Sequence, residues 1–330
     1  MSSSKSKATF KSSLAPLMEQ FVQEKRAIGY RYKIGAGVLM RFDRFLAHHA
    51  TDGAGLTRSA IVEWLAKRPI ETPSTQRHRF AVVRDFAEFM CRMGHPAFVP
   101  GRSLTAKGPS SFAPHIFTQP EVRGLLQEVD RLEPSANSPL RHLVMPEIFR
   151  LLCRCGFRVG EVLKLRNDDV DLNTGVLTVR EGKFDRDRLV PPALPLVERL
   201  RSYDAAASAV VGARRGAAAF FPSEAGGRYH SNSVYEVFRQ LLARCGIPHG
   251  GRGKGPRVHD LRHTFAVHTM LRWYREGADF EAKLPVLATY MGHQSIRGTA
   301  RYLHLTAELF PEVAARVNAA FGDVIPRSVP

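Results

Sequence analysis

A polar segment at residues 99–114, VPGRSLTAKGPSSFAP, divides the chain into two parts with different sequence patterns. The segment holds three prolines and two glycines, which interrupt helices and strands and are typical of a linker between domains. At 330 residues the chain is long for one domain and long enough for two. We therefore predict a flexible basic tail at 1–12, a first domain at 13–98, the linker at 99–114 and a second domain at 115–330.

The first domain, residues 13–98, is predicted to be helical throughout. Its apolar residues recur three and four positions apart in four separate stretches, which places them on one face of an α-helix. The strongest of the four, PSTQRHRFAVVRDFAEFMCRMG at 73–94, carries Arg77, Arg79 and Arg84. These arginines fit two interpretations equally well, a solvated helix face or a row of DNA-binding contacts to the phosphate backbone.

The second domain combines helical stretches with one short β-hairpin. The helical pattern begins at TQPEVRGLLQEVDRL and is interrupted at Gly156. The stretches GVLTVR and GKFDRDRLVPP then read as two short strands around a polar turn. Helical patterns return after the hairpin and continue to LFPEVAARVNAAFG. The fold class expected for the whole chain is therefore mainly α with a small β-sheet, an α+β arrangement.

The charge of the chain is strongly positive, with a formal net charge of +17 and an isoelectric point of about 10.2. Residues 1–110 contain 18 Lys and Arg against 8 Asp and Glu, and the remaining 220 residues contain 30 against 23. Both parts thus carry an excess of positive charge. Such an excess indicates a polyanionic partner, most often nucleic acid.

The cysteines and the hydropathy pattern bear on where the protein works. Four cysteines, Cys91, Cys153, Cys155 and Cys245, do not form a disulfide framework in a chain of this length, so a reduced cytosolic setting fits better. No stretch approaches 18 consecutive apolar residues, and the N-terminal MSSSKSKATF lacks the apolar core of a signal peptide. We expect a soluble protein without a membrane partner that acts in the cytoplasm, associated with the nucleoid.

The stretch VHDLRHTFAVH brings two histidines and an arginine into the first turns of a predicted helix. The helix should start at His259 or Asp260, directly after GKGPR. The free N–H groups and the positive dipole end of a helix favour an anion there, and the planar guanidinium of Arg262 suits two oxygens of a phosphate. Lys254 and Arg257, just before the helix, are further candidates for contacts to DNA.

Three other kinds of site are disfavoured. A zinc site at His259 and His263, four residues apart, lacks an HExxH motif and an obvious Cys or carboxylate partner. The glycine-rich GGRGKGP does not match the phosphate-binding loop G-x-x-x-x-G-K-[ST], and no G-x-S-x-G motif of a serine hydrolase occurs. We therefore expect no metal and no cofactor.

Five short motifs in the second domain occur in a specific order and spacing. They are Arg158 in GFRVGE, Lys183 in a GK…R-VP hairpin, His259 and Arg262 in HDLR, His293 in GH, and Tyr302 nine residues later. Together they resemble the tyrosine recombinase (phage integrase) family over about residues 115–320. One departure is the 31-residue spacing from Arg262 to His293, several residues longer than the compact family pattern. The extra length lies in LRWYREGADFEAKLP.

The resemblance implies a strand-transfer reaction at one DNA phosphate. Tyr302 would attack the phosphorus, form a 3′-phosphotyrosine and free a 5′-hydroxyl. Arg158 and Arg262 would neutralise the charge that builds on the non-bridging oxygens. His293 would add a hydrogen bond to the same phosphate, and Glu161 would orient Arg158.

Proton transfer falls to two further residues in this scheme. Lys183, at the tip of the hairpin, would be the general acid for the leaving oxygen, and His259 the base or proton relay. No metal is required because arginines supply the positive charge, and no ATP is required because the phosphotyrosine stores the bond energy. His263 and His268 fit packing or supporting positions better than catalytic ones.

The family also implies an assembly on double-stranded DNA. A homotetramer would exchange strands between two duplexes in integration, excision or transposition, and a monomer in solution is compatible with this scheme. The first domain would be a core-binding domain. The last helix, about 309–321, would dock on a neighbouring protomer or pack within its own domain. Sister recombinases and accessory proteins stay open as further partners.

Three alternative functions come from other classes. A type IB topoisomerase-like enzyme resembles this active site but relaxes DNA as a monomer. A catalytically inactive DNA-binding relative would keep the fold, although the complete catalytic set argues against it. A metal-dependent nuclease is disfavoured because no carboxylate cluster is apparent.

Overall fold

In the computed structural model, the chain forms two compact units, Met1–Phe112 and Ala113–Pro330. The structure describes residues 10–48, 55–105, 114–135, 138–180, 187–223, 227–251, 255–293, 295–300 and 302. The predictions made for Lys183, Lys254, the helix at 309–321 and most of the tail lie outside these residues. None of the helices that the described ranges contain is long and apolar enough to cross a membrane.

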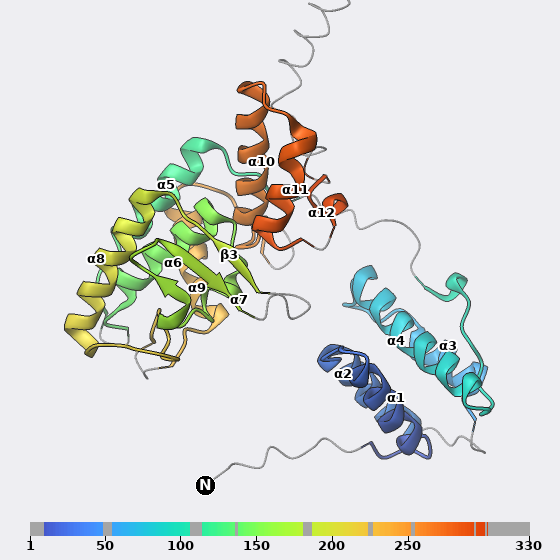
Figure 1. Ribbon diagram of the computed structural model, residues 1–330. Helices are drawn as coiled ribbons and strands as arrows, with labels where there is room; N and C mark the ends of the chain where they lie inside the picture. Colours follow the sequence, from blue (N-terminus) through green and yellow to red (C-terminus); the bar gives the residue numbers. More distant parts are fainter. Residues whose placement is uncertain are drawn as a thin grey trace, which may run out of the picture. The chain divides into compact units, whose positions relative to one another are not determined.

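The first unit is a small helical bundle built around its longest described helix (Figure 1). Its elements are α1 (Ala15–Ala27), α2 (Lys33–His48), α3 (Arg58–Leu65), α4 (Pro73–Arg92) and the 3-10 helix η1 (Arg102–Leu104). α4 contacts each of the other three α-helices. It buries Phe80, Val83 and Phe86 on one side, as its apolar spacing predicts. Burial of this face, rather than helix propensity, stabilises the unit.

Arg79 faces the interior of this bundle and is only 2% exposed. Its Nε and Nη2 both donate to the carboxylate of Glu71 at 2.6 Å, and Nη1 donates to the carbonyl of Trp64. A further bond runs to the carbonyl of Ala66 at 3.1 Å. The guanidinium therefore satisfies backbone carbonyls at the end of α3, which have no partner within the helix. The prediction that Arg79 contacts DNA is wrong, because its charge is used inside the fold.

The buried pair of Arg79 and Glu71 leads to a stability prediction. Arg79→Ala will lower the free energy of unfolding of the first unit by about 3 kcal/mol, because it leaves a buried carboxylate and two carbonyls without their donor. The chain has two tryptophans, so a Trp273→Phe background lets Trp64 report on this unit alone. Urea titration of Trp64 fluorescence will show the shift. Lys67→Ala, at an exposed position, is the control, and equal midpoints for the two variants would contradict the prediction.

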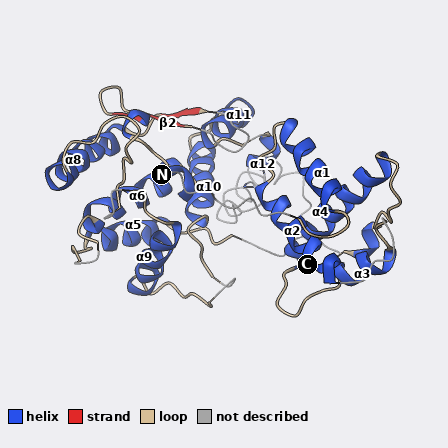
Figure 2. Ribbon diagram, turned by 90° about the horizontal axis from the view of Figure 1, so that it is seen from below, coloured by secondary structure: helices blue, strands red, loops and turns tan. Residues whose placement is uncertain are grey.

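The second unit packs helices around α6, with a small sheet at one side (Figures 1 and 2). Its helices are α5 (Gln119–Asp130), α6 (Arg141–Cys155), α7 (Val159–Val162), α8 (Leu194–Val211), α9 (Ser231–Arg244), α10 (Asp260–Arg275), α11 (Phe280–Met291), α12 (Ile296–Ala300) and the 3-10 helix η2 (Asn167–Asp169). α6 contacts α5, α7, α8 and α10 and is buried along most of its length.

The sheet contains the predicted hairpin. Its strands are β1 (Val170–Asp171), β2 (Val176–Val179) and β3 (Arg188–Val190), antiparallel in the order β1-β2-β3. Leu177 pairs with Val190, and both side chains are buried against the helices. The hairpin prediction is confirmed, and so is the fold class, mainly helical with a small β-sheet. The two-residue strand β1 has no signal of its own in the sequence.

Two helix boundaries position the candidate site. α6 ends at Gly156, whose φ of +62° is left-handed and whose missing Cβ leaves room for the ring of Phe265 on α10. This turn places Arg158 at the start of α7. α10 begins at Asp260, as expected, and the carboxylate of Asp260 accepts a bond from the backbone N–H of Arg257 at 2.9 Å.

The 31-residue spacing between Arg262 and His293 has a structural explanation. The added residues extend α10 to Arg275 and let α11 begin at Phe280, and the two helices contact each other. Their apolar faces form a separate small core, whose members are Ala266, Val267, Met270, Leu271, Leu287, Met291 and Tyr302. The additional residues thus build part of the support for the tyrosine.

Candidate active site

Arg262 is the most deeply buried charged group of the site, with 1% of its surface exposed. Its Nη1 donates to the carbonyl of Gly156 and its Nη2 to the carbonyl of Met291, each at 2.5 Å. Burial, followed by repulsion from Arg158, lowers its pKa to about 10, so Arg262 stays charged at neutral pH. The guanidinium is thereby fixed between the ends of α6 and α11.

Arg158 is held by Glu161 on the same turn. Its backbone N–H donates to Oε2 of Glu161 at 2.9 Å and its Nη1 to Oε1 at 2.6 Å. Its Nη2 also donates to the carbonyl of Gly292 at 3.2 Å. This geometry supports the interpretation that Glu161 orients Arg158.

Arg188, at the start of β3, is a third arginine of the site; it is the arginine of the GK…R-VP motif, to which no role was assigned from the sequence. Its Nη2 donates to Glu161 at 2.7 Å and its Nε to the carbonyl of Tyr290 at 3.0 Å. Burial alone would raise the pKa of Glu161, but the bonds and charges of Arg188 and Arg158 lower it to about 2. Glu161 is therefore ionised at neutral pH and joins the hairpin to Arg158.

Backbone carbonyls at the carboxyl ends of two helices stabilise these closely spaced arginines. α6 offers the carbonyl of Gly156, and α11 offers those of Tyr290, Met291 and Gly292. Carbonyls at a helix C-terminus lack helical partners and carry partial negative charge. They offset the repulsion between like charges and fix each guanidinium before any ligand binds.

His293 follows α11 directly after the left-handed Gly292. Gly292 has a φ of +67°, which strains residues that carry a Cβ, and a Cβ there would also lie 2.9 Å from Nη1 of Arg188. His293 Nδ1 shares a hydrogen bond of 2.7 Å with the hydroxyl of the fully buried Thr299. Burial, and then the charge of Arg262, lowers the pKa of His293 to about 4, so the ring is neutral at pH 7. If Nδ1 accepts from Thr299, the ring proton lies on Nε2 and can be donated to a phosphate.

Tyr302 is 4% exposed, and its hydroxyl lies 3.0 Å from Nδ1 of His263. Its ring packs against His263 and His293, with centroids 5.4 and 6.0 Å away. The charge of Arg262 also interacts with Tyr302. His259 meets the ring of His263 edge to face at 4.8 Å, and its pKa falls to about 4, first because it is buried and then because of His263.

The structure thus brings five of the six predicted catalytic residues into one cluster of side chains, which we refer to as the pocket, and the sixth, Lys183, lies outside the described residues. The five are Arg158, His259, Arg262, His293 and Tyr302. Arg188 and Thr299, which were given no role from the sequence, also belong to this cluster, and His263, expected in a packing or supporting position, lies beside the hydroxyl of Tyr302. His268 lies elsewhere on α10, where its Nδ1 is 2.9 Å from Nε2 of Gln119.

The other proposed DNA contacts vary in exposure. Arg257 is 44% exposed and pairs with Asp260 at 3.0 Å. Arg84 donates to the carbonyl of Pro100 at 2.8 Å, pairs with Glu88 at 2.8 Å and stays partly exposed, as does Arg77. Their contacts with DNA stay predictions.

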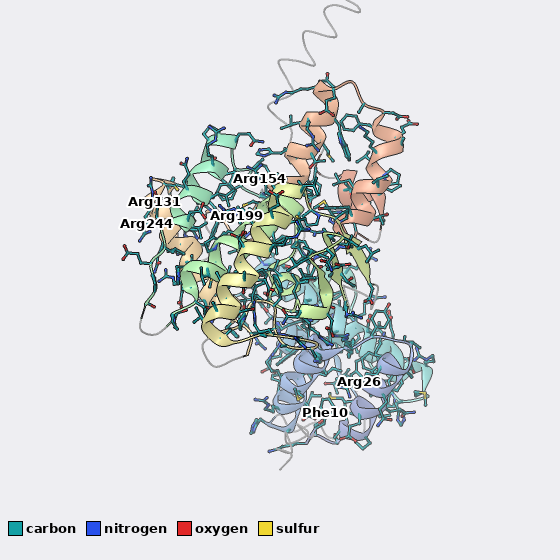
Figure 3. All side chains as sticks on the ribbon, turned by 60° about the vertical axis from the view of Figure 1, so that its left-hand side comes forward. Phe10, Arg26, Arg131, Arg154, Arg199 and Arg244 are labelled. Atoms are coloured by element: carbon teal, nitrogen blue, oxygen red, sulfur yellow. The ribbon has the colours of Figure 1, made fainter. Side chains whose placement is uncertain are left out.

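Several arginines remote from the pocket are matched by carboxylates. Figure 3 shows Arg131 and Arg244 close together where α5 and α9 end, and both pair with Glu128. Arg199, also labelled there, donates to Glu147 at 2.7 Å. These arginines therefore form ion pairs within the second unit, and Glu128 is shared by two of them.

The pocket can bind a tetrahedral anion and present a hydroxyl to it. Two guanidinium groups supply fixed positive charge, and the neutral His293 can add a hydrogen bond. Tyr302 brings a hydroxyl next to a histidine nitrogen. This combination fits nucleophilic attack on a phosphate.

Comparisons with known proteins agree with this chemistry. The chain matches the model of the phage integrase family over residues 115–308. It is 32% identical over 303 residues to y4rE of Sinorhizobium fredii, assigned as an integrase/recombinase, covering 92% of this chain and 95% of that protein. It is 31% identical over 239 residues to the tyrosine recombinase XerD of Mycobacterium tuberculosis, covering 72% of this chain and 69% of that protein.

Solved structures show the same fold at lower sequence identity. The XerH site-specific recombinase, in a post-cleavage complex with its palindromic difH substrate, matches with a TM-score of 0.64 at 18% identity, over 92% of this chain and 84% of that one. The Tn1549 transposon integrase, in complex with circular intermediate DNA, matches with a TM-score of 0.60 at 16% identity, over 87% of this chain and 94% of that one. Because the family model spans more than half of the sequence, the chain belongs to the phage integrase family and is a tyrosine-type site-specific recombinase.

Proposed function

We propose that this recombinase cuts and rejoins DNA at a specific site through a covalent bond between Tyr302 and a 3′ phosphate. One observation carries the proposal: the hydroxyl of Tyr302 is hydrogen-bonded to His263, which directly follows the buried Arg262 on α10. A nucleophile and an anion-binding group in fixed positions are what attack on a phosphodiester requires.

The arginines would stabilise the charge that develops during this attack. Arg158 and Arg262 are each anchored to backbone carbonyls, so little reorganisation is needed when the phosphate arrives. His293, neutral and fixed by Thr299, would add one hydrogen bond to a non-bridging oxygen. Glu161 and Arg188 would not touch the phosphate but would hold Arg158 in position.

The leaving 5′ oxygen needs a proton, and the energy of the cleaved phosphodiester bond must be conserved for rejoining. Lys183, expected at the tip of the hairpin, would protonate the 5′ oxygen as it leaves. The new phosphodiester to Tyr302 replaces the broken one, so a 5′-hydroxyl from either duplex can reverse the step without ATP. This reversal would join strands of two different sites.

Duplex DNA is therefore the substrate, and the assembly on it is part of the proposal. Several solved structures with this fold are complexes with DNA, among them XerH with difH and a lambda integrase dimer on a core site. We propose a homotetramer on paired sites, with the first unit as a core-binding domain. The helix at 309–321 would join neighbouring protomers. Sister recombinases and accessory proteins would act on the same assembly.

A covalent adduct formed without metal tests the proposed function. Among the described residues, no group of three or more His, Cys, Asp or Glu side chains is placed to hold a metal ion. The arginines supply the charge instead, so the wild-type chain will form its adduct in excess EDTA. The probe is a nicked duplex, selected by the full chain from DNA fragments that flank its gene and analysed on a denaturing gel.

This gel, together with a gel-shift assay and a plasmid-relaxation assay, separates the alternatives. An adduct on the 3′ side of the break supports the phosphotyrosine proposal. Cleavage that is lost in EDTA and restored by Mg²⁺ would indicate a metal-dependent nuclease. Binding of the selected duplex without any adduct would indicate a relative that has lost catalysis. Relaxation of supercoiled plasmid in place of strand exchange would indicate a topoisomerase.

A further inference from the structure

We infer that His263 takes the proton from the hydroxyl of Tyr302 during cleavage and returns it during rejoining. The inference rests on the proposed function of the pocket and assigns a role to a residue outside the predicted catalytic set. Its basis is the distance of 3.0 Å from His263 Nδ1 to the tyrosine oxygen. That oxygen is the reacting atom, so His263 touches the chemistry directly.

The position of His263 on α10 explains why it reaches the tyrosine. It directly follows Arg262, and neighbouring side chains on a helix point in directions about 100° apart. Arg262 turns toward the carbonyls of Gly156 and Met291, whereas His263 turns toward Tyr302. The anion-binding group and the proton acceptor are thus consecutive residues with different orientations.

His259 lies one helical turn earlier and contacts His263 rather than replacing it. The two rings meet at 90° with centroids 4.8 Å apart. The ring of His259 contacts the ring of His263, whereas His263 contacts the hydroxyl of Tyr302 itself. We therefore assign the orientation of His263 to His259, and the tyrosine proton to His263.

The proton balance of the step is complete. The bond from Tyr302 Oη to phosphorus forms while the bond from phosphorus to the 5′ oxygen breaks. The hydroxyl proton passes to Nδ1 of a neutral His263, whose other proton is on Nε2. The leaving 5′ oxygen receives a proton from the general acid, proposed to be Lys183. In rejoining, the His263 imidazolium returns its proton to the departing Oη.

Two substitutions distinguish proton transfer from Tyr302 to His263 from a hydrogen bond that only orients the tyrosine. His263→Asn keeps a polar group near the position of Nδ1 but accepts no proton at neutral pH, and His263→Ala removes the group. The matched control is His268→Asn, on the same helix and bonded to Gln119. Each full-length variant is assayed for thermal melting, for binding of the selected duplex, and for single-turnover adduct formation.

The expected result is normal melting and DNA binding in all variants. Adduct formation falls about a hundredfold in both His263 variants and is unchanged in His268→Asn. Because His263 is only half-buried, added imidazole can enter the space left in His263→Ala and restore part of the rate. Rescue that grows with the neutral imidazole concentration supports proton transfer.

Other results would overturn the inference. A near wild-type rate in His263→Asn would show that a hydrogen bond suffices. Faster adduct formation in His263→Ala would show that His263 restrains the tyrosine.

A readout independent of activity is the ¹⁵N spectrum of labelled histidines, in which Tyr302→Phe shifts the His263 signal but not that of His268. An unchanged His263 signal would show that His263 does not contact Tyr302 in solution. Failure of the wild-type chain to form any adduct would instead overturn the proposed function.

Discussion

Tyr302→Phe will bind its DNA site as tightly as the wild-type chain and will form no covalent complex with it. The substitution removes one oxygen, and the phenyl ring keeps its place in the small core between α10 and α11. The lost hydrogen bond to His263 costs about 1 kcal/mol, which the fold can tolerate. No other group replaces the missing nucleophile, so the loss of adduct will be complete rather than partial.

The measurement is a denaturing gel of the nicked duplex after incubation with each variant, with binding followed separately by gel shift. Peptide mapping of the wild-type adduct will place the nucleotide on Tyr302. Tyr290→Phe is the control, because Tyr290 is the nearest alternative tyrosine in the sequence before His293. Its hydroxyl points to the carbonyl of Pro191 at 3.5 Å, and burial raises its pKa, so it is a poor nucleophile. An adduct that persists in Tyr302→Phe, or that maps to Tyr290, would falsify the assignment.

The residues that could be predicted from the sequence share a local constraint. Arg158 follows a glycine turn that ends α6, and Arg262 stands in the first turn of α10. His293 follows a left-handed glycine at the end of α11. Turns and helix starts leave short, ordered patterns in a sequence, and several such patterns in the right order are specific. The site was predictable to the extent that it is built from such boundaries.

The residues that were missed depend on contacts between distant segments. Arg188 joins Glu161 across 27 positions, and His263 meets Tyr302 across 39. No periodicity or turn signal marks either pair, because each partner fits an ordinary helix or strand position. Thr299 likewise reads as a neutral helix residue until its hydroxyl is seen beside His293. Such roles follow from packing, which the local sequence does not encode.

Arg79, in contrast, was named as a candidate DNA contact from the sequence but is buried in the structure. Its place among polar residues of a basic helix suggested a surface group, and both interpretations weighed for it assumed exposure. The structure instead pairs it with Glu71 beneath Trp64, whose ring lies 5.4 Å from the guanidinium carbon. A buried ion pair needs the partner charge and several carbonyls at once, and these come from a different helix end. The sequence carries no sign of that convergence.

Arg262→Lys will reduce the rate of adduct formation about a thousandfold while leaving DNA binding nearly unchanged. The guanidinium bonds two carbonyls on different helices through separate nitrogens and still offers further N–H groups. A lysine ammonium is a single point and cannot hold both carbonyls and a phosphate in the same geometry. Burial next to Arg158 will also favour the neutral amine, which supplies no charge at all.

Binding and chemistry separate in this variant because they depend on different numbers of contacts. DNA affinity comes from many phosphate contacts across a basic chain, so one altered group changes it little. The transition state depends on the few donors that meet the reacting phosphate. Arg272→Lys is the matched control, since Arg272 lies at an exposed position on the same helix, where it pairs with Glu276. Single-turnover rates of the two variants on the nicked duplex decide the assignment: cleavage by Arg262→Lys within about tenfold of the control would exclude Arg262 as the phosphate clamp.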